Sequence, residues 1–330
     1  MQAIAISGFG GPEVFHAIEV PDPIVGDGQV IIDVRATSVN PIDQKIRSGF
    51  VPAITPAFPA VLHADVAGIV SAVGPGVTHL KEGDAVWGCA GGFKGLPSGA
   101  LADRMLTDAR LVGLKPASLN FQEAAALPLV GLTSWLSLVD RAQVQRGQRV
   151  LIHAGTGGVG HVGVQLAKAL GAEVHTTVSS DHKASICRQL GADHTIFYTR
   201  ENPEEYVHSA TQGQGYDVVF DTVGGDNLDA SFAAARVGGT VVNIAARSTH
   251  DLSPMHAKSL TLHVVFLVSL IGTPDRRGLI LERLNGLAKM VESGQLKPLI
   301  DPAVFEIQDV ADAHAYRDGG ETIGKVVLIR

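Results

Sequence analysis

The segment at residues 149–172 constrains the fold more than any other part of this 330-residue chain. It reads RVLIHAGTGGVGHVGVQLAKALGA, a short apolar run followed by a glycine-rich turn and a helical pattern. The turn matches G-x-G-x-x-G, and in this strand–turn–helix context the glycines let the backbone approach a pyrophosphate at a helix N-terminus. A tight turn without a ligand is the alternative. The residues expected to contact a dinucleotide here are Gly155, Thr156, Gly157, Gly158, Val159 and Gly160.

Strand and helix patterns alternate after this turn. Residues 173–180, 194–198, 216–223 and 240–246 have strand character, and helical patterns separate them. Such alternation predicts βαβ units, which build a parallel sheet with helices on both faces. A further helical stretch opens at Asn120, where Glu123 completes a capping-box pattern.

The N-terminal third reads differently, as strands and turns without a long helical pattern. It predicts a small, barrel-like β domain, and the strand in the C-terminal GKVVLIR can rejoin that domain. We therefore expect an α/β protein with a β-rich domain at 1–120 and 297–330 and a dinucleotide-binding domain at 121–296. The apolar run at 264–271 is too short to span a bilayer and is interpreted as a buried strand.

The second strand of the alternating region indicates which dinucleotide is bound. NAD binders place an acid about 20 residues after the glycine turn, against the ribose hydroxyls, but the position near Val178 has none. Ser179, Ser180 and Lys183 follow instead, and hydroxyls with a cation suit a 2′-phosphate. This favours NADPH over NADH. Asp181 can contact a ribose or repel a phosphate, and the two serines can equally be helix caps.

Composition excludes several classes of function. The net charge of −7 argues against a nucleic-acid partner. Only two cysteines, Cys89 and Cys187, fit a reducing cytoplasm, and no secretion signal or membrane span is evident. The histidines at 153, 161, 175 and 182 have no metal-ligand spacing.

The order of several motifs resembles the medium-chain dehydrogenase/reductase superfamily, and within it the zinc-independent quinone oxidoreductase (zeta-crystallin-like) branch. The motifs are GPEVF, VNPIDQKIRSG, DVAGIVSAVGPGV, GDAVWG, LPLVGLTSW, VLIHAGTGGVG, DVVFDTVGG and GKVVL. The resemblance implies a GroES-like β domain, a Rossmann domain and a cleft between them for the nicotinamide. It also implies a homodimer paired through edge strands, for which SLTLHVVFLV at 259–268 is the candidate.

The resemblance also bears on metal binding. Asn40 stands where zinc alcohol dehydrogenases of this superfamily carry a Cys ligand, and Ala64 stands at their His position. The structural zinc lobe needs four cysteines, which this chain lacks. We therefore expect no metal. His63 leaves an alternative open: an unusual site with Asp65 or Cys89, or a hydrogen-bonded residue lining a cleft.

Hydride transfer without zinc requires hydrogen bonds to the anion that develops on the substrate oxygen. Quinones and α,β-unsaturated carbonyl compounds suit this weaker help, because their reduced anions are delocalised. The resemblance implies that Asn40 donates such a hydrogen bond and that Thr133 positions the nicotinamide. Lys45 replaces a common Tyr and can meet the substrate, a phosphate or solvent, so water is the expected proton donor.

Other cofactor contacts follow from the resemblance alone. Lys183 and Ser179 match the family's 2′-phosphate pocket. The other matches to the family are Tyr198, Val223, Gly224, Phe266 and Arg317. For Tyr198 and Phe266, core packing is the alternative. Two other functions stay open, an atypical metal-dependent alcohol dehydrogenase and a non-catalytic NADPH-binding protein.

Overall fold

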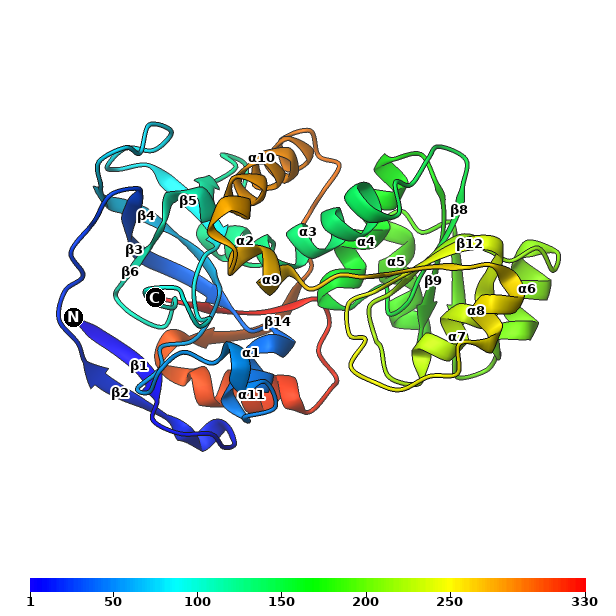
Figure 1. Ribbon diagram of the computed structural model, residues 1–330, viewed down its shortest axis with the longest axis horizontal. Coiled ribbons are helices and arrows are strands. Elements are labelled where there is room, and N and C mark those ends of the chain that lie inside the picture. Colours follow the sequence, from blue (N-terminus) through cyan, green and yellow to red (C-terminus); the bar gives the residue numbers. More distant parts are fainter. The chain divides into compact units, whose positions relative to one another are not determined.

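The computed structural model describes all 330 residues as two compact units (Figure 1). The first, here called the β unit, comprises Met1–Leu132, Val268–Gly294 and Pro298–Arg330. The second, here called the Rossmann unit, comprises Thr133–Leu267 and Gln295–Lys297. This division differs from the expected boundaries mainly at residues 268–294, which belong to the β unit. No helix combines the length and the apolar character needed to cross a membrane.

The β unit is built on a seven-stranded sheet in which β3 is the central, longest strand. Its order is β14-β15-β3-β4-β5-β7, and β6 also pairs with β3. Strand β15 lies antiparallel to β3, which confirms that the C-terminal strand rejoins this part of the chain. The strands are β1 (Gln2–Ile6), β2 (Phe15–Glu19), β3 (Gln29–Ser38), β4 (Asp65–Val73), β5 (Ala85–Cys89), β6 (Arg104–Asp108), β7 (Val112–Leu114), β14 (Ile300–Glu306) and β15 (Lys325–Ile329).

The helices of the β unit include a short one that was not predicted from the sequence. Residues 41–47 form a short helix, α1, in which Pro41 occupies the first turn and Asp43 Oδ2 accepts a hydrogen bond from Asn40 N at 2.8 Å. Proline at this position and a reciprocal cap both favour a helix start. The helices are α1 (Pro41–Arg47), α2 (Phe121–Ala125), α10 (Arg277–Glu292) and α11 (Val310–Asp318).

Helix α10 explains why residues 268–294 belong to the β unit (Figure 1). It buries Leu284 and Leu287 completely and contacts β7. A side chain at Gly131 would meet Leu287 at 2.8 Å, so glycine permits this close approach. Arg277 adds an ion pair to Asp108 at 2.9 Å, and both side chains are largely buried. These contacts assign the helix to the β unit, although in the sequence it follows the last Rossmann strand, with only a short helix and a turn between them.

The Rossmann unit contains a six-stranded sheet in the order β10-β9-β8-β11-β12-β13, with every neighbouring pair parallel. This is the doubly wound order that the alternating pattern predicted. Its core includes Tyr216, Phe220 and Phe232, all fully buried. The elements are β8 (Arg149–Ile152), α4 (Gly158–Ala169), β9 (Glu173–Val178), α5 (Asp181–Gln189), β10 (His194–Phe197), α6 (Pro203–Thr211), β11 (Tyr216–Asp221), α7 (Asn227–Ala234), β12 (Ala235–Asn243), α8 (Ser253–Lys258) and β13 (Thr261–Val264).

Two apolar segments depart from expectation. The run at 264–271 is not one buried strand: β13 ends at Val264, and α9 (Leu267–Ile271) follows. The helical stretch after Asn120 is divided into α2, α3 (Pro128–Trp135) and a π-helical turn, Leu136–Arg141. Its capping box is confirmed, because Asn120 Oδ1 accepts a hydrogen bond from Glu123 N at 2.8 Å and Glu123 Oε2 accepts one from Asn120 N at 2.9 Å.

Candidate dinucleotide site and buried polar network

The order of strands in the Rossmann unit reverses between β8 and β11, which lie side by side. In open parallel sheets, ligands bind at the carboxyl ends of the two neighbouring strands between which the strand order reverses. Here the connections that follow these two strands are tied together. His153 N donates to Phe220 O at 3.0 Å, and Thr222 Oγ1 donates to His153 O at 2.6 Å. The turn after β8 and the loop after β11 therefore form one rigid edge.

The turn after β8 leaves no room for side chains at two of its glycines. A Cβ on Gly155 would lie 2.2 Å from Thr176 Oγ1, and one on Gly160 would lie 2.1 Å from Ala154 O. Gly157 is the N-cap of α4 and has no side chain to satisfy the first amides of the helix. The free N–H groups and the helix dipole suit an anion. The predicted segment 155–160 thus has the backbone geometry that a pyrophosphate requires.

The carboxyl end of β9 holds the residues predicted to recognise a 2′-phosphate. Ser180 caps α5, since its hydroxyl accepts a hydrogen bond from Lys183 N at 3.3 Å. Ser180 thus acts as a helix cap, the alternative role that the sequence analysis left open for the two serines. Ser179 and Lys183 are both half-buried beside it.

Arg200 is a cation at this edge that the sequence analysis missed. It follows β10, lies 3.9 Å from the exposed carboxylate of Asp181, and stacks 4.4 Å from the ring centre of Phe197. A neighbouring guanidinium reduces the repulsion that Asp181 would exert on a phosphate. The sequence signal for this cation was a basic residue just after β10.

The loop after β11 is held by Asp221, a second residue that the sequence analysis missed. Asp221 is fully buried, and its Oδ1 accepts from Val223 N and Gly224 N, both at 2.9 Å, and from Asn227 Nδ2 at 2.8 Å. Its Oδ2 accepts from Asn243 Nδ2 at 2.7 Å. The predicted contacts Val223 and Gly224 therefore owe their position to this carboxylate. Val223 itself is 51% exposed at the strand end.

Tyr198 and Phe266 follow the carboxyl ends of β10 and β13. They are 57% and 46% exposed, so the alternative of core packing is wrong for both. Together with the turn after β8 and the end of β9, they lie along one edge of the same sheet. Thr133 lies apart from this edge in sequence, on α3, and is largely buried.

In the β unit, Asn40 lies in a buried polar network. Lys325 Nζ donates to Asn40 Oδ1 and, at 3.1 Å, to Val39 O, and it lies 3.5 Å from Asp65 Oδ2. Asn40 Nδ2 donates to Asp65 Oδ2 at 2.8 Å. Its other polar contact is Ser38 O at 3.5 Å, the limit of a hydrogen bond. All three network residues, Asn40, Asp65 and Lys325, are buried.

The network holds charges that burial perturbs. Burial lowers the pKa of Lys325, and the charges of Asp65 and Asp43 offset part of that effect. Burial likewise raises the pKa of Asp43 to about 7, although the hydrogen bond from Asn40 N opposes it. Asp65 is fully satisfied by Leu129 N on one oxygen and by Ser38 Oγ and Asn40 on the other. Each charge of this buried pair compensates the other, so removal of either partner would leave an uncompensated buried charge.

These residues fit a zinc ion poorly. Asn40, at the position where the resemblance puts a metal ligand, directs its Oδ1 at the ammonium of Lys325, a cation that would repel a metal ion. His63 turns to His314, with their Nε2 atoms 2.9 Å apart, and its Nδ1 lies 3.3 Å from Thr37 Oγ1. Burial lowers the pKa of His63 to about 3 and raises that of the Cys89 thiol. His63 is thus hydrogen-bonded and fully buried, and a place in the lining of a cleft stays a prediction.

Two other predicted residues lie near this network. Lys45 is half-buried on α1. Arg317, on α11, donates a hydrogen bond to Gln44 of α1, and burial lowers its pKa. Both side chains thus belong to the α1–α11 region of the β unit, and a phosphate contact for Arg317 stays a prediction.

Comparison with known proteins matches both units. Residues 26–117 match the alcohol dehydrogenase GroES-like domain family, and residues 158–282 match the zinc-binding dehydrogenase family. The chain is 35% identical to the NADPH-dependent alkenal/one oxidoreductase of Arabidopsis thaliana, over 99% of this chain and 79% of that protein. It is 35% identical to the quinone oxidoreductase of Pseudomonas aeruginosa, over 99% and 98%. The quinone oxidoreductase of Escherichia coli, solved in complex with NADPH, superposes with a TM-score of 0.88 at 31% identity and full coverage of both chains.

Proposed function

Because the chain belongs to the medium-chain dehydrogenase/reductase superfamily, in its quinone oxidoreductase branch, we propose that it reduces quinones or α,β-unsaturated carbonyl compounds with NADPH and without zinc. One observation carries the proposal: the buried ammonium of Lys325 is bonded to Asn40 and lies 3.5 Å from Asp65. This buried cation beside Asn40 and Asp65 supports a site without zinc, because a second cation there would be repelled.

NADPH, when bound, supplies the hydride. The chain's own residues bind and orient it. The amides at the start of α4 receive the pyrophosphate, and Asp221 holds the neighbouring loop rigid. Ser179, Lys183 and Arg200 offer one hydroxyl and two cations for the 2′-phosphate. This set supports NADPH over NADH, as do the names of the relatives.

Asn40 is proposed to donate a hydrogen bond to the substrate oxygen. Its Oδ1 accepts from the Lys325 ammonium, and this polarises the amide so that its N–H groups become stronger donors. One Nδ2 hydrogen is committed to Asp65 at 2.8 Å. The other reaches only Ser38 O at 3.5 Å, a weak contact that a substrate oxygen would replace. Because Asn40 is fully buried, this donation requires the surrounding segments to open toward the substrate. A hydrogen bond is sufficient for quinones and enones because their reduced anions are delocalised.

The remaining roles rest on position alone. Thr133 is proposed to position the nicotinamide, and Lys45 to contact the substrate or a phosphate. Tyr198 and Phe266, exposed at the carboxyl edge of the sheet, are proposed to flank the cofactor. Water is the proposed proton donor.

We also propose a homodimer in a reducing compartment. Strand β13 is an edge of the Rossmann sheet, and its Val264 is 55% exposed. Both cysteines, Cys89 and Cys187, are free. A monomeric mass in solution at working concentration would refute the dimer.

The first experiment measures NADPH oxidation by EDTA-treated protein. Benzoquinone and an α,β-unsaturated ketone are parallel acceptors, NADH is the cofactor control, and metal content is measured on the same sample. Turnover without metal supports the proposal, and the faster acceptor identifies the substrate class. Activity that returns only with added zinc would show that the chain is an atypical metal-dependent dehydrogenase. Tight NADPH binding without turnover on any acceptor would favour a non-catalytic binding protein.

A further inference from the structure

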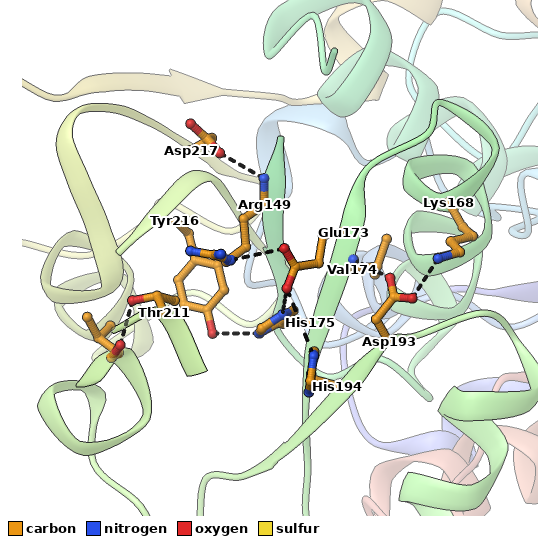
Figure 2. Close-up of polar contacts among 11 residues, drawn as sticks. Arg149, Lys168, Glu173, Val174, His175, Asp193, His194, Thr211, Tyr216 and Asp217 are labelled. Atoms are coloured by element: carbon orange, nitrogen blue, oxygen red, sulfur yellow. Dashed lines mark hydrogen bonds and ion pairs between the residues drawn. The ribbon is translucent and has the colours of Figure 1, made fainter. Parts of the chain in front are cut away.

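The amino-terminal edge of the Rossmann sheet carries a cluster that hydride transfer does not use (Figure 2). Glu173 is the first residue of β9, and His175 follows two positions later on the same face of the strand. His194 is the first residue of β10 and pairs in register with His175. The parallel register thus brings three potential metal ligands together, at the opposite end of the strands from the glycine turn. Sequence spacing alone gave no sign of this.

The three ligand atoms converge. Glu173 Oε1 lies 3.0 Å from His175 Nε2 and 3.9 Å from His194 Nε2, and all three atoms lie within 4.8 Å of one another. Ligands of a tetrahedral zinc ion with N and O donors are about 3.3 Å apart. The pair of Glu173 and His175 already has this spacing. His194 needs only a small side-chain rotation, which is open to it because its side chain is 59% exposed.

Neighbouring groups hold two of the ligands in the required orientation. Figure 2 shows Glu173 between Arg149 and the histidines: Arg149 Nε donates to Oε2 at 3.3 Å, which leaves Oε1 directed at the imidazoles. His175 Nδ1 lies 3.0 Å from the hydroxyl of the buried Tyr216. Without a metal ion, Nε2–H donates to Glu173 Oε1 at 3.0 Å. Metal binding therefore requires the other tautomer, in which Nδ1–H donates to the Tyr216 hydroxyl and Nε2 carries the lone pair.

The charged neighbours of the cluster are largely paired with one another. Arg149 opposes a second cation, and Asp217, which accepts from the backbone N of Arg149 at 2.7 Å, is itself paired with Arg236 at 2.7 Å. Asp193, beside His194 in sequence, is bonded to Lys168 at 2.6 Å. The site thus has one carboxylate and two imidazoles as donors, with partial repulsion from Arg149. This composition favours a borderline transition metal over calcium or magnesium, which prefer oxygen ligands alone.

We propose that Glu173, His175 and His194 bind a divalent transition-metal ion of the zinc class, with water at the open position, and that this ion ties the edge strand β10 to β9. The ion is separate from hydride transfer, because the site lies at the other end of the sheet from the dinucleotide edge. Its expected effect is on the stability of the Rossmann unit.

The test is zinc titration of tag-free, EDTA-treated and desalted protein, followed by calorimetry and thermal unfolding. The key variant is His194→Ala, in which only an exposed ligand is removed. Glu173→Gln is the second variant and keeps the shape of the side chain. The matched control is His182→Ala, an exposed histidine on α5 of the same unit.

The wild type and His182→Ala are expected to bind one zinc ion per chain. With zinc at a hundred times its Kd, the midpoint of unfolding should rise by roughly 5 °C. His194→Ala and Glu173→Gln should each lose at least tenfold in affinity and most of that rise. The rate of NADPH oxidation without metal should be the same in His194→Ala and wild type. Equal zinc binding by His194→Ala and wild type, or no binding by wild type, would overturn the proposal.

Discussion

The ammonium group of Lys325 and the side-chain carbonyl of Asn40 are in direct hydrogen-bond contact, although 285 residues separate them in the sequence. The contact joins the start of β15 to the start of α1 and places Asp65 between a cation and an amide. It links the most buried charges of the β unit to the residue proposed to act on the substrate.

Replacing Lys325 by Met should therefore affect both stability and catalysis. The substitution leaves Asp65 as an uncompensated buried charge, which costs about 3 kcal/mol of unfolding free energy. It also removes the polarisation of Asn40, so kcat for quinone reduction should fall by about tenfold or more while KM for NADPH changes little. Urea unfolding and steady-state kinetics measure the two effects. Lys289→Met, at an exposed position of α10, is the control and should change neither.

Asp43 should make the stability of the protein depend on pH. In the unfolded chain its carboxyl has a pKa of 3.8, and in the folded protein burial raises the pKa to about 7. Between those values the folded protein binds more protons than the unfolded chain, so the contribution of Asp43 to the free energy of unfolding falls as pH rises.

The variant Asp43→Asn isolates this effect, since an amide oxygen can still accept from Asn40 N. At pH 8 it should be more stable than wild type by on the order of 3 kcal/mol, and the difference should shrink toward pH 5. Denaturant unfolding at several pH values measures it. Asp312→Asn, exposed on α11, should show no such trend. A difference that stays constant from pH 5 to 8 would mean that Asp43 is ionised throughout.

Gly160→Ala should abolish dinucleotide binding. The added methyl group would lie 2.1 Å from Ala154 O, so the turn has to move away from the position that leaves the α4 amides free. A loss of at least tenfold in NADPH affinity is expected, measured by fluorescence titration. Gly278→Ala, where nothing lies within 4 Å, should bind NADPH normally. Unchanged affinity in Gly160→Ala would place the pyrophosphate elsewhere.

Lys183→Ala and Arg200→Ala should each raise KM for NADPH by roughly tenfold, because each removes one cation from the 2′-phosphate. NADH has no such phosphate, and its KM should stay the same. Arg188→Ala is the control on α5, since Arg188 bonds to Thr195 at the other end of that helix. An equal rise for both cofactors would indicate general loosening of the site rather than phosphate recognition.

Local patterns predicted most of the Rossmann unit and much less of the β unit. The glycine turn and each strand–helix step of the Rossmann unit are encoded by short stretches of neighbouring residues, as is the capping box at Asn120 in the β unit. The start of α1 had a local signal as well, a proline followed by an acid two positions later, but no helix was predicted there. Helix α10 was assigned to the wrong unit because its burial against β7 depends on tertiary packing.

The site residues that the sequence analysis missed depend on distant pairing. Asp221 acts by accepting hydrogen bonds from backbone amides, and a pattern of residue types does not reveal such contacts. His175 and His194 meet only because β9 and β10 pair in one particular register. Lys325 was noticed only as part of the GKVVL motif, and its contact with Asn40 requires β15 to lie beside β3.

The β unit is discontinuous in sequence, and this determines the order in which the protein can be completed. A ribosome has to make all of Thr133–Leu267 before it reaches β14 and β15. Until then β3 lacks one of its partners, and Asp65 has no ammonium to balance it. The Rossmann sheet, in contrast, is made in one uninterrupted stretch and can close first. The nascent chain thus exposes an unfinished β unit next to a finished domain, which is the stage at which chaperones are most useful.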